Sequence, residues 1–179
     1  EQKSFVNILN NFYDTKIYES LPRIGNMDSK LIIIEFVDYN CGYCKKTLST
    51  ISKLIKNFNN IQIVFIDYPI LSESSEIAAR ASLAANEQNA YFEYHTILLN
   101  NTKLINENIL YKIAKELSLD IEKFKKDMSS DKIKNKIIEN INFANNLKIR
   151  GTPTFIIGKQ ILPGAYDYEK LRKIILENS

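Results

Sequence analysis

The distribution of apolar and polar positions along the chain first picks out two short apolar runs. Residues 31–37 and 61–66 are rich in isoleucine, valine and phenylalanine, which is typical of strands buried on both faces of a sheet. Between them, apolar side chains recur at helical spacing, at Leu48, Ile51, Leu54, Ile55 and Phe58. The order strand, helix, strand predicts a βαβ unit with parallel strands and a right-handed crossover.

The segments on either side of this unit carry helical patterns. Residues 1–27 contain one amphipathic stretch and two helix breakers, with apolar positions at Phe5, Ile8, Leu9 and Phe12 and breaks at Pro22 and Gly25. From residue 72 to about residue 147 the pattern predicts several helices and no strand. Asn108 and Asp120 are the expected N-caps of two of these helices.

Strand signals return near the C-terminus. Residues 154–157 and 160–162 flank Gly158 and Lys159, and this pattern predicts a hairpin. Apolar positions at helical spacing then predict a closing helix, at Tyr168, Leu171, Ile174 and Ile175. The whole chain therefore reads as an α/β fold with βαβ and ββα halves. We expect an N-terminal helical extension over 1–27, a main domain over 28–72 and 147–179, and an inserted helical subdomain over 73–146.

Composition narrows the class of protein. The 179 residues are 45% hydrophobic and 25% charged, as in ordinary globular proteins, and the net charge is only +3. Because the lysines are spread out and interleaved with acids, nothing indicates a nucleic-acid partner. No apolar run approaches the roughly 18 residues of a membrane span. The chain starts without Met and without a signal peptide, so we expect an exported protein whose signal peptide has been removed.

The chain holds two cysteines, Cys41 and Cys44, at the expected start of the first βαβ helix. A thiol at a helix N-terminus faces free backbone N–H groups and the positive end of the helix dipole, and both stabilise a thiolate. Lys45 and Lys46 add positive charge there. We therefore expect Cys41 to be the exposed, attacking sulfur of a thiol–disulfide exchange site and Cys44 the inward, resolving one.

Two other interpretations of the cysteine pair remain open. A zinc site needs four ligands, and the chain offers two cysteines and one histidine, His95, so it would have to be shared between subunits. Two inert core cysteines are also possible, although Asp38, Asn40 and Gly42 suggest a turn at a surface. A Cys-x-x-Cys pair beside a βαβ pattern favours the redox interpretation.

At this point the chain resembles the DsbA-like branch of the thioredoxin superfamily. Residues 35–45 look like the active-site segment of the exported DsbA, Com1 and ScsC-type proteins, and residues 151–155 look like their second signature. Residues 68–71, 78–81 and 163–165 also match. The resemblance covers roughly residues 25–179. It implies a thioredoxin fold, a central mixed β-sheet flanked by helices, with an all-helical insertion between its βαβ and ββα halves.

The resemblance also implies roles for single residues. Thr152–Pro153 would be a cis peptide bond facing Cys41, and the Thr152 backbone would pair with an extended substrate; locally, Pro153 could equally be a strand-start proline. Glu35 would be a buried carboxylate that assists proton transfer at Cys44, whereas a solvent-facing strand edge is its alternative.

The remaining expectations concern the surroundings of the motif. Gly42 and Tyr43 would contact substrate, and Tyr39 is a further candidate to line the substrate surface. His95 is treated as a structural residue.

The implied function is introduction of disulfides into cysteine-containing exported proteins, in a periplasmic or otherwise exported location. We expect no metal or organic cofactor beyond the Cys41–Cys44 disulfide, and a membrane DsbB-like or quinone-linked oxidase as redox partner. Classical DsbA has Pro-His between its cysteines, whereas Gly42–Tyr43 is also found in DsbC and ScsC-type proteins, so the direction of electron flow stays open. The alternatives are an oligomeric disulfide isomerase or reductase, and a non-catalytic thioredoxin-like metal-binding protein.

Overall fold

A mixed five-stranded sheet forms the centre of the structure, a computed structural model that describes residues 2–179. The strands are β1 (Arg23–Gly25), β2 (Leu31–Val37), β3 (Ile61–Asp67), β4 (Thr154–Ile157) and β5 (Gln160–Pro163), in the order β1-β3-β2-β4-β5. β2 and β3 are parallel, as the βαβ pattern predicted, and the other neighbours are antiparallel. The mixed sheet expected from the resemblance is confirmed.

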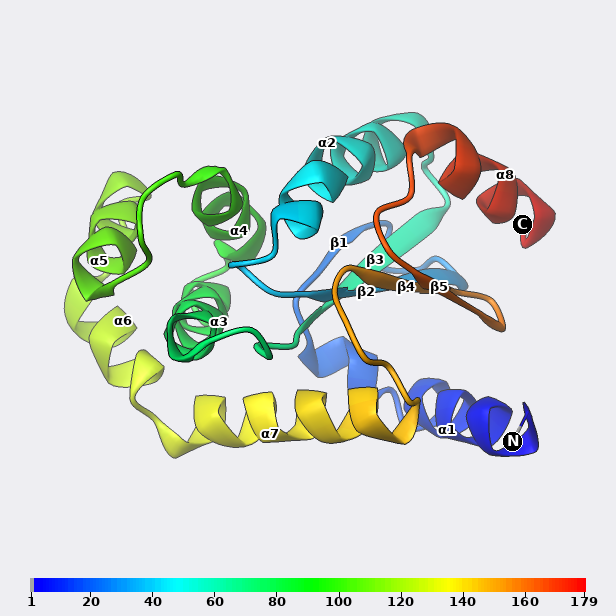
Figure 1. The fold of residues 1–179 in the computed structure, drawn as a ribbon, viewed down its shortest axis with the longest axis horizontal. Helices are drawn as coiled ribbons and strands as arrows, with labels where there is room; N and C mark the ends of the chain where they lie inside the picture. The colour runs from blue at the N-terminus through cyan, green and yellow to red at the C-terminus, as the bar shows by residue number, and fades with distance from the viewer. Residues whose placement is uncertain (1) are drawn as a thin grey trace.

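Helices cover both faces of this sheet (Figure 1). On one face lie α2 (Gly42–Asn57) and α8 (Tyr168–Glu177), and on the other lie α1 (Gln2–Asp14) and α7 (Asp131–Asn146). Because side chains alternate along a strand, β2 sends Ile33 and Glu35 toward α2 and sends Ile34 and Phe36 toward α7. Coverage on both faces explains why β2 and β3 are nearly continuous apolar runs.

A block of helices lies between β3 and β4 in the chain and to one side of the sheet in Figure 1. It consists of α3 (Glu73–Asn86), α4 (Tyr91–Asn100), α5 (Glu107–Glu116), α6 (Ile121–Met128) and the start of α7. Its own apolar cluster extends to Cys41, Cys44 and Leu48. The helical block therefore packs directly against the segment that carries the cysteines.

Two local predictions were wrong. Asn106, not Asn108, caps α5, because its side chain accepts a hydrogen bond from the Ile109 N–H three residues on. β1 was also missed: Pro22 and Gly25 bracket a strand of three residues that pairs with the edge of β3. A short 3₁₀ helix, Ile17–Ser20, precedes it. The cap predicted at Asp120 is confirmed.

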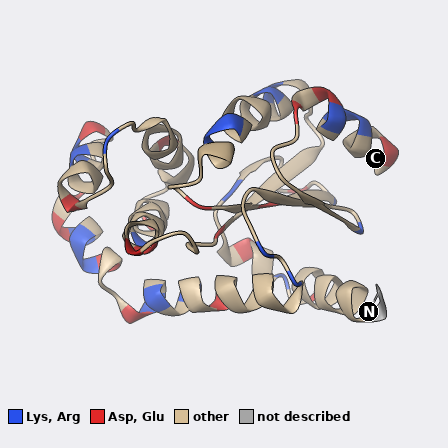
Figure 2. Cartoon of the chain, in the orientation of Figure 1, with Lys and Arg blue, Asp and Glu red and all other residues tan. Residues whose placement is uncertain are grey.

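Charged side chains are spread along the outer helices, with both signs close together (Figure 2). Many pair within one helix, as Lys136 does with Glu139 and Lys112 with Glu116. Such exposed pairs contribute little to stability. Within residues 2–179, no helix is both long enough and apolar enough to cross a membrane.

Candidate active site

The two cysteines lie where the chain turns from β2 into α2. Cys41 is the N-cap residue of α2, and Cys44 lies within the first turn of that helix. Both are free thiols. Cys44 is fully buried, whereas the Cys41 residue is 8% exposed. The order of exposure is as expected, but Cys41 is more covered than the term "exposed sulfur" implied.

Asp38 determines the shape of the loop before Cys41. One of its carboxylate oxygens accepts hydrogen bonds from the Asn40 N–H and the Ser75 hydroxyl, at 2.8 and 2.7 Å. The other accepts the backbone N–H groups of Ile70 and Leu71, at 2.9 and 3.0 Å. The expected turn is present, because the Cys41 N–H donates to the Asp38 carbonyl oxygen at 3.1 Å and Asn40 is exposed, but the Asp38 side chain itself is only 1% exposed. It joins the cysteine loop to the segment between β3 and α3.

The surroundings of Cys41 favour its thiolate. They lower the pKa of Cys41 from 9.0 to about 5, mainly through a hydrogen bond from the Cys44 thiol, although burial opposes the shift. The Thr152 side chain and the backbone N–H groups of Cys44 and Tyr43 also favour the charged form. These amides belong to the first turn of α2, where helix N–H groups lack partners within the helix. With this pKa, Cys41 is ionised at neutral pH, and the thiolate is the nucleophilic form of cysteine.

Cys44 has the opposite character. Burial raises the pKa of its thiol well above the ordinary range, and the proximity of Cys41 and Glu35 raises it further. The same two-residue spacing therefore yields one sulfur that ionises readily and one that stays protonated. An exchange site needs this difference, because one sulfur attacks or leaves as thiolate while the other holds a proton.

Glu35 lies on β2, the strand between β3 and β4, and is 1% exposed. This position rules out a solvent-facing strand edge. Its Oε1 accepts a hydrogen bond of 2.8 Å from the Thr47 hydroxyl, whereas its Oε2 is buried without a partner among the described residues. Burial raises the pKa of Glu35 from 4.5 to about 7, and the Thr47 hydrogen bond opposes this shift. Glu35 can therefore exchange a proton near neutral pH.

The loop before β4 lies against Cys41. The Thr152–Pro153 peptide bond is cis, and the Cys41 Sγ lies 3.1 Å from the Thr152 carbonyl oxygen, which accepts from the thiol. The Thr152 hydroxyl is instead a donor that favours the thiolate, so Thr152 offers a partner to either protonation state of Cys41. A cleft of about 310 Å³ runs along this loop and is lined by Thr152, Pro153 and Gly164, among others.

A buried polar network behind the site was not predicted from the sequence. The Tyr39 hydroxyl lies 2.9 Å from Nδ1 of His95 and 3.3 Å from the Tyr91 hydroxyl, which in turn donates to Asp67 at 3.1 Å. Burial raises the pKa of Asp67 to about 7 and lowers that of His95 to about 3. Tyr39 points inward, so it does not line a substrate surface, whereas Tyr43 is 62% exposed. The network joins residues of three separate segments, the loop after β2, the end of β3 and α4, and no local pattern could reveal it.

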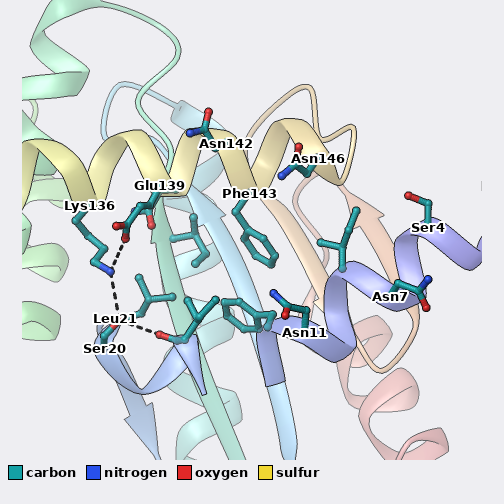
Figure 3. A pocket seen from close by; sticks show the side chains of 15 residues that line it. Ser4, Asn7, Asn11, Ser20, Leu21, Lys136, Glu139, Asn142, Phe143 and Asn146 are labelled. Atoms are coloured by element: carbon teal, nitrogen blue, oxygen red, sulfur yellow. Dashed lines mark hydrogen bonds and ion pairs between the residues drawn. The ribbon is translucent and has the colours of Figure 1, made fainter. Parts of the chain in front are cut away.

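A larger cavity, of about 950 Å³, lies away from the cysteines, between α1, α7 and the sheet (Figure 3). Phe12 and Phe143 stack in it at 4.6 Å, and asparagines from both helices surround them. Lys136 bonds to Glu139 and Ser20 near one end. Over residues 2–179, no cluster of three or more His, Cys, Asp or Glu side chains could hold a metal ion.

The fold and this cysteine pair define a domain of the thioredoxin-like thiol–disulfide oxidoreductases. Its central sheet, the pair at the start of α2 and the loop opposite them are the features that define this class. The chain belongs to the DSBA-like thioredoxin domain family, whose model matches residues 32–176. The family suggested by residues 35–45 and 151–155 is thus confirmed.

Individual relatives agree with this assignment. The thiol-disulfide exchange protein alpha-DsbA2 of Wolbachia pipientis is 30% identical, with a TM-score of 0.90 over 99% of this chain and 97% of that one. The catalytic domain of Proteus mirabilis ScsC is 27% identical, with a TM-score of 0.85 and the same coverage. A probable disulfide bond formation protein D from Bacillus anthracis is 27% identical over 88% of this chain and 78% of its own length.

Other curated relatives are much longer. A Na⁺/H⁺ antiporter, NhaA 1 of Salinispora arenicola, is 28% identical over 149 residues, but the match spans 82% of this chain and only 23% of the antiporter. The chain thus spans about a quarter of the length of such relatives.

Proposed function

We propose that the protein introduces disulfides into cysteine-containing exported proteins by dithiol–disulfide exchange at Cys41. The observation that carries this proposal is the difference between the two sulfurs. The environment of Cys41 lowers its pKa to about 5, whereas burial raises that of Cys44 well above the ordinary range. Only one sulfur is therefore suited to react with a partner in solution.

The exchange proceeds in two balanced steps. A substrate thiolate attacks Sγ of Cys41 in the oxidised pair, a mixed disulfide forms, and Cys44 leaves and takes up a proton. Glu35, with a pKa of about 7, supplies that proton and regains one from solvent. The second substrate thiolate then attacks the substrate sulfur of the mixed disulfide. Cys41 leaves as thiolate, the substrate holds a disulfide, and the pair is left reduced by two electrons.

Substrate alignment belongs to the loop opposite Cys41 and to the start of α2. We expect the backbone of Thr152 to pair with an extended substrate segment, with Pro153 fixing the loop. Thr152 is partly exposed, and the cleft along this loop adjoins it. Gly42 and Tyr43 are exposed next to the reactive sulfur, and a Cβ at Gly42 would meet nothing within 4 Å. A bulky substrate chain can therefore approach from that side.

The low pKa of Cys41 also supports the oxidising direction. Stabilising the Cys41 thiolate stabilises the reduced protein relative to the disulfide, and this makes the disulfide a stronger oxidant. An oxidase of this kind needs reoxidation, for which we propose a membrane quinone-linked, DsbB-like oxidase. It also needs an oxidising compartment, and we propose the periplasm or another exported location.

The first test is exchange itself. The reduced protein should oxidise reversibly, and in a glutathione series its reduction potential should lie near or above that of the glutathione couple. Cys41→Ser should abolish oxidation of a dithiol peptide. Cys44→Ser, mixed with glutathione disulfide, should accumulate a mixed disulfide at Cys41 and release one glutathione thiolate, because no second protein sulfur is left to resolve it. Full activity of Cys41→Ser would overturn the proposal, as would a Cys41–Cys44 pair that forms no reversible disulfide.

Gly42 and Tyr43 favour a second candidate, a disulfide isomerase or reductase, because the resemblance associates this dipeptide with DsbC and ScsC-type proteins. Such an enzyme keeps its pair reduced and generally acts as an oligomer. A potential well below the glutathione couple would indicate a reductase. Light scattering measures the oligomeric state. Refolding of a scrambled substrate by a protein that proves to be an oligomer would indicate an isomerase.

A metal-binding role is a weaker candidate. Metal that co-purifies with the protein and is lost in Cys41→Ser would indicate it.

A further inference from the structure

Thr47 has a place in the site that neither the exchange steps nor the family signatures assign. It lies on α2, one turn after Cys44, and is 1% exposed. Its hydroxyl oxygen lies 2.8 Å from Oε1 of Glu35 and 2.8 Å from the carbonyl oxygen of Cys44. A threonine hydroxyl carries one proton, so it donates fully to only one of these acceptors at a time.

The protonation state of Glu35 decides between the two acceptors. An ionised carboxylate accepts the stronger, charge-assisted bond, so the Thr47 proton points to Oε1 in that state. When Glu35 is protonated, its attraction for the hydroxyl falls, and the Cys44 carbonyl offers the same hydroxyl another acceptor at the same distance. Thr47 is therefore never left as a buried donor without a partner, which would be costly.

The same contact separates the two oxygens of Glu35. Thr47 occupies Oε1, whereas Oε2 is buried and has no partner among residues 2–179. Glu35 is also one of the groups whose charge raises the pKa of Cys44. Oε2 is thus the oxygen left to exchange a proton with Cys44, while Oε1 anchors the carboxyl group.

We propose that Thr47 is a positioning residue that stabilises the ionised form of Glu35 and leaves Oε2 free for proton exchange with Cys44. The proposal rests on the proposed function, since it deepens the role given to Glu35. The Thr47 hydroxyl is buried, and its hydrogen bonds go to Glu35 and to the Cys44 backbone carbonyl, so it acts through the carboxyl group. Removing the hydroxyl should therefore change when Glu35 ionises without blocking the exchange chemistry.

The direct test is the titration of Glu35 in the reduced full chain, followed by carboxyl ¹³C NMR and assigned with Glu35→Gln. Thr47→Val keeps the shape of the side chain but removes the donor, and we expect the Glu35 midpoint to rise by about one pH unit. Thr47→Ser restores the hydroxyl and should titrate as the wild type does. Thr50→Val is the matched control, because Thr50 is a buried threonine on the same helix and does not bond to Glu35.

The kinetic test follows release of glutathione by Cys44 from a mixed disulfide prepared at Cys41. In Thr47→Val the pH profile of this release rate should shift upward by about one pH unit, as the Glu35 midpoint does. The rate should therefore fall about tenfold at pH values below the Glu35 midpoint and be unchanged well above it. In a Glu35→Gln background, Thr47→Val should change the rate less than about twofold. Should Thr47→Val fold poorly, Thr47→Ala provides the same readouts.

The outcomes separate this proposal from the proposed function. An unchanged Glu35 midpoint in Thr47→Val would overturn it, and so would a rate effect that persists in Glu35→Gln. The NMR titration needs no catalysis. Failure of the wild-type pair to form a reversible disulfide would therefore overturn the proposed function while leaving the titration result intact.

Discussion

Glu35 and Asp38 lie three residues apart, one in β2 and one in the loop that follows, and each is 1% exposed. Their hydrogen-bond partners differ sharply. Asp38 accepts four hydrogen bonds that use both of its oxygens, whereas Glu35 accepts one, from Thr47, and keeps one buried oxygen without a partner. The same chemical group is thus placed in two different electrostatic settings within one short segment.

This difference in hydrogen bonding suits the two acids to different roles, a structural one for Asp38 and proton exchange for Glu35. The four donors fix the Asp38 carboxylate and, through it, the loop that carries Cys41 and the segment that leads to α3. Glu35 lacks such compensation, so burial raises its pKa to about 7, in the range where a proton can be exchanged at neutral pH. Asp38 therefore stabilises the loop, whereas Glu35 is suited to the proton-transfer role that we propose.

The largest effect should come from removing the well-bonded acid. Asp38→Ala leaves four donors without an acceptor, and we expect it to lower the free energy of unfolding by about 3 to 4 kcal/mol. Urea unfolding of the reduced protein measures this. Asp38→Asn retains one oxygen but places an NH₂ group against two other donors, so its loss should be intermediate. A loss below about 1 kcal/mol for Asp38→Ala would contradict the role given to these bonds.

The next effect is a pH dependence that belongs to Glu35. Its pKa is 4.5 when unfolded and about 7 when folded, so between these values the folded state holds the extra proton. The contribution of Glu35 to the free energy of unfolding is therefore complete below pH 4.5. It is lost as the pH rises toward 7 and amounts to about 3 kcal/mol in the reduced protein. Glu35→Gln should remove this part of the slope in urea unfolding at pH 4.5, 6 and 8. An unchanged slope would show that Glu35 is not the titrating group.

The sequence predicted most of the framework that positions these acids. The apolar runs at 31–37 and 61–66 gave β2 and β3, because strands buried on both faces must be nearly all apolar. Glu35 stood out because an acid is costly in such a run. β1 was missed, since three residues beside Pro22 carry too little pattern. Asn108 was predicted as a cap because asparagine is a good N-cap residue, but Asn106 lies two residues earlier and is the one that accepts the Ile109 N–H.

What the sequence could not give was the set of partners around each polar group. Asp38 followed by Asn40 and Gly42 is typical of a surface turn, yet its donors come partly from residues about 32 to 37 positions away. Thr47 falls on the buried face of an amphipathic helix, where nothing local marks it as the partner of Glu35. Partnership of this kind depends on tertiary contacts, which hydrophobic periodicity does not encode.

A third buried acid, Asp67, resembles Glu35 and not Asp38. Asp67 accepts a 3.1 Å bond from the Tyr91 hydroxyl, its other oxygen has no partner among the described residues, and burial raises its pKa to about 7. Tyr91→Phe should lower stability by about 1 kcal/mol at pH 8, and by less at pH 5.5, where protonated Asp67 depends less on a donor. Urea unfolding at the two pH values measures this difference.

Tyr91→Phe also tests whether Asp67 influences proton exchange between Glu35 and Cys44. Asp67 is not among the groups that shift the pKa of Cys44, so Tyr91→Phe should leave the pH profile of glutathione release by Cys44 in place. A pH profile that moves with Tyr91→Phe would mean that Asp67 is coupled to Glu35. The pKa of Glu35 would then depend on more than its own hydrogen-bond partners.

The smallest effect should come from the lysines beside the motif. Lys45 and Lys46 follow Cys44, but both are exposed; Lys45 reaches toward the Asn100 carbonyl oxygen, and Lys46 lies over the Tyr43 ring at 4.9 Å. Neither is among the causes of the low pKa of Cys41. Because water and salt screen exposed charges, Lys45→Gln and Lys46→Gln should each move the thiolate titration of Cys41, followed by absorbance at 240 nm, by less than about 0.5 pH unit. A larger shift that disappears in high salt would mean that surface charge, and not the buried hydrogen bonds, sets the reactivity of this thiol.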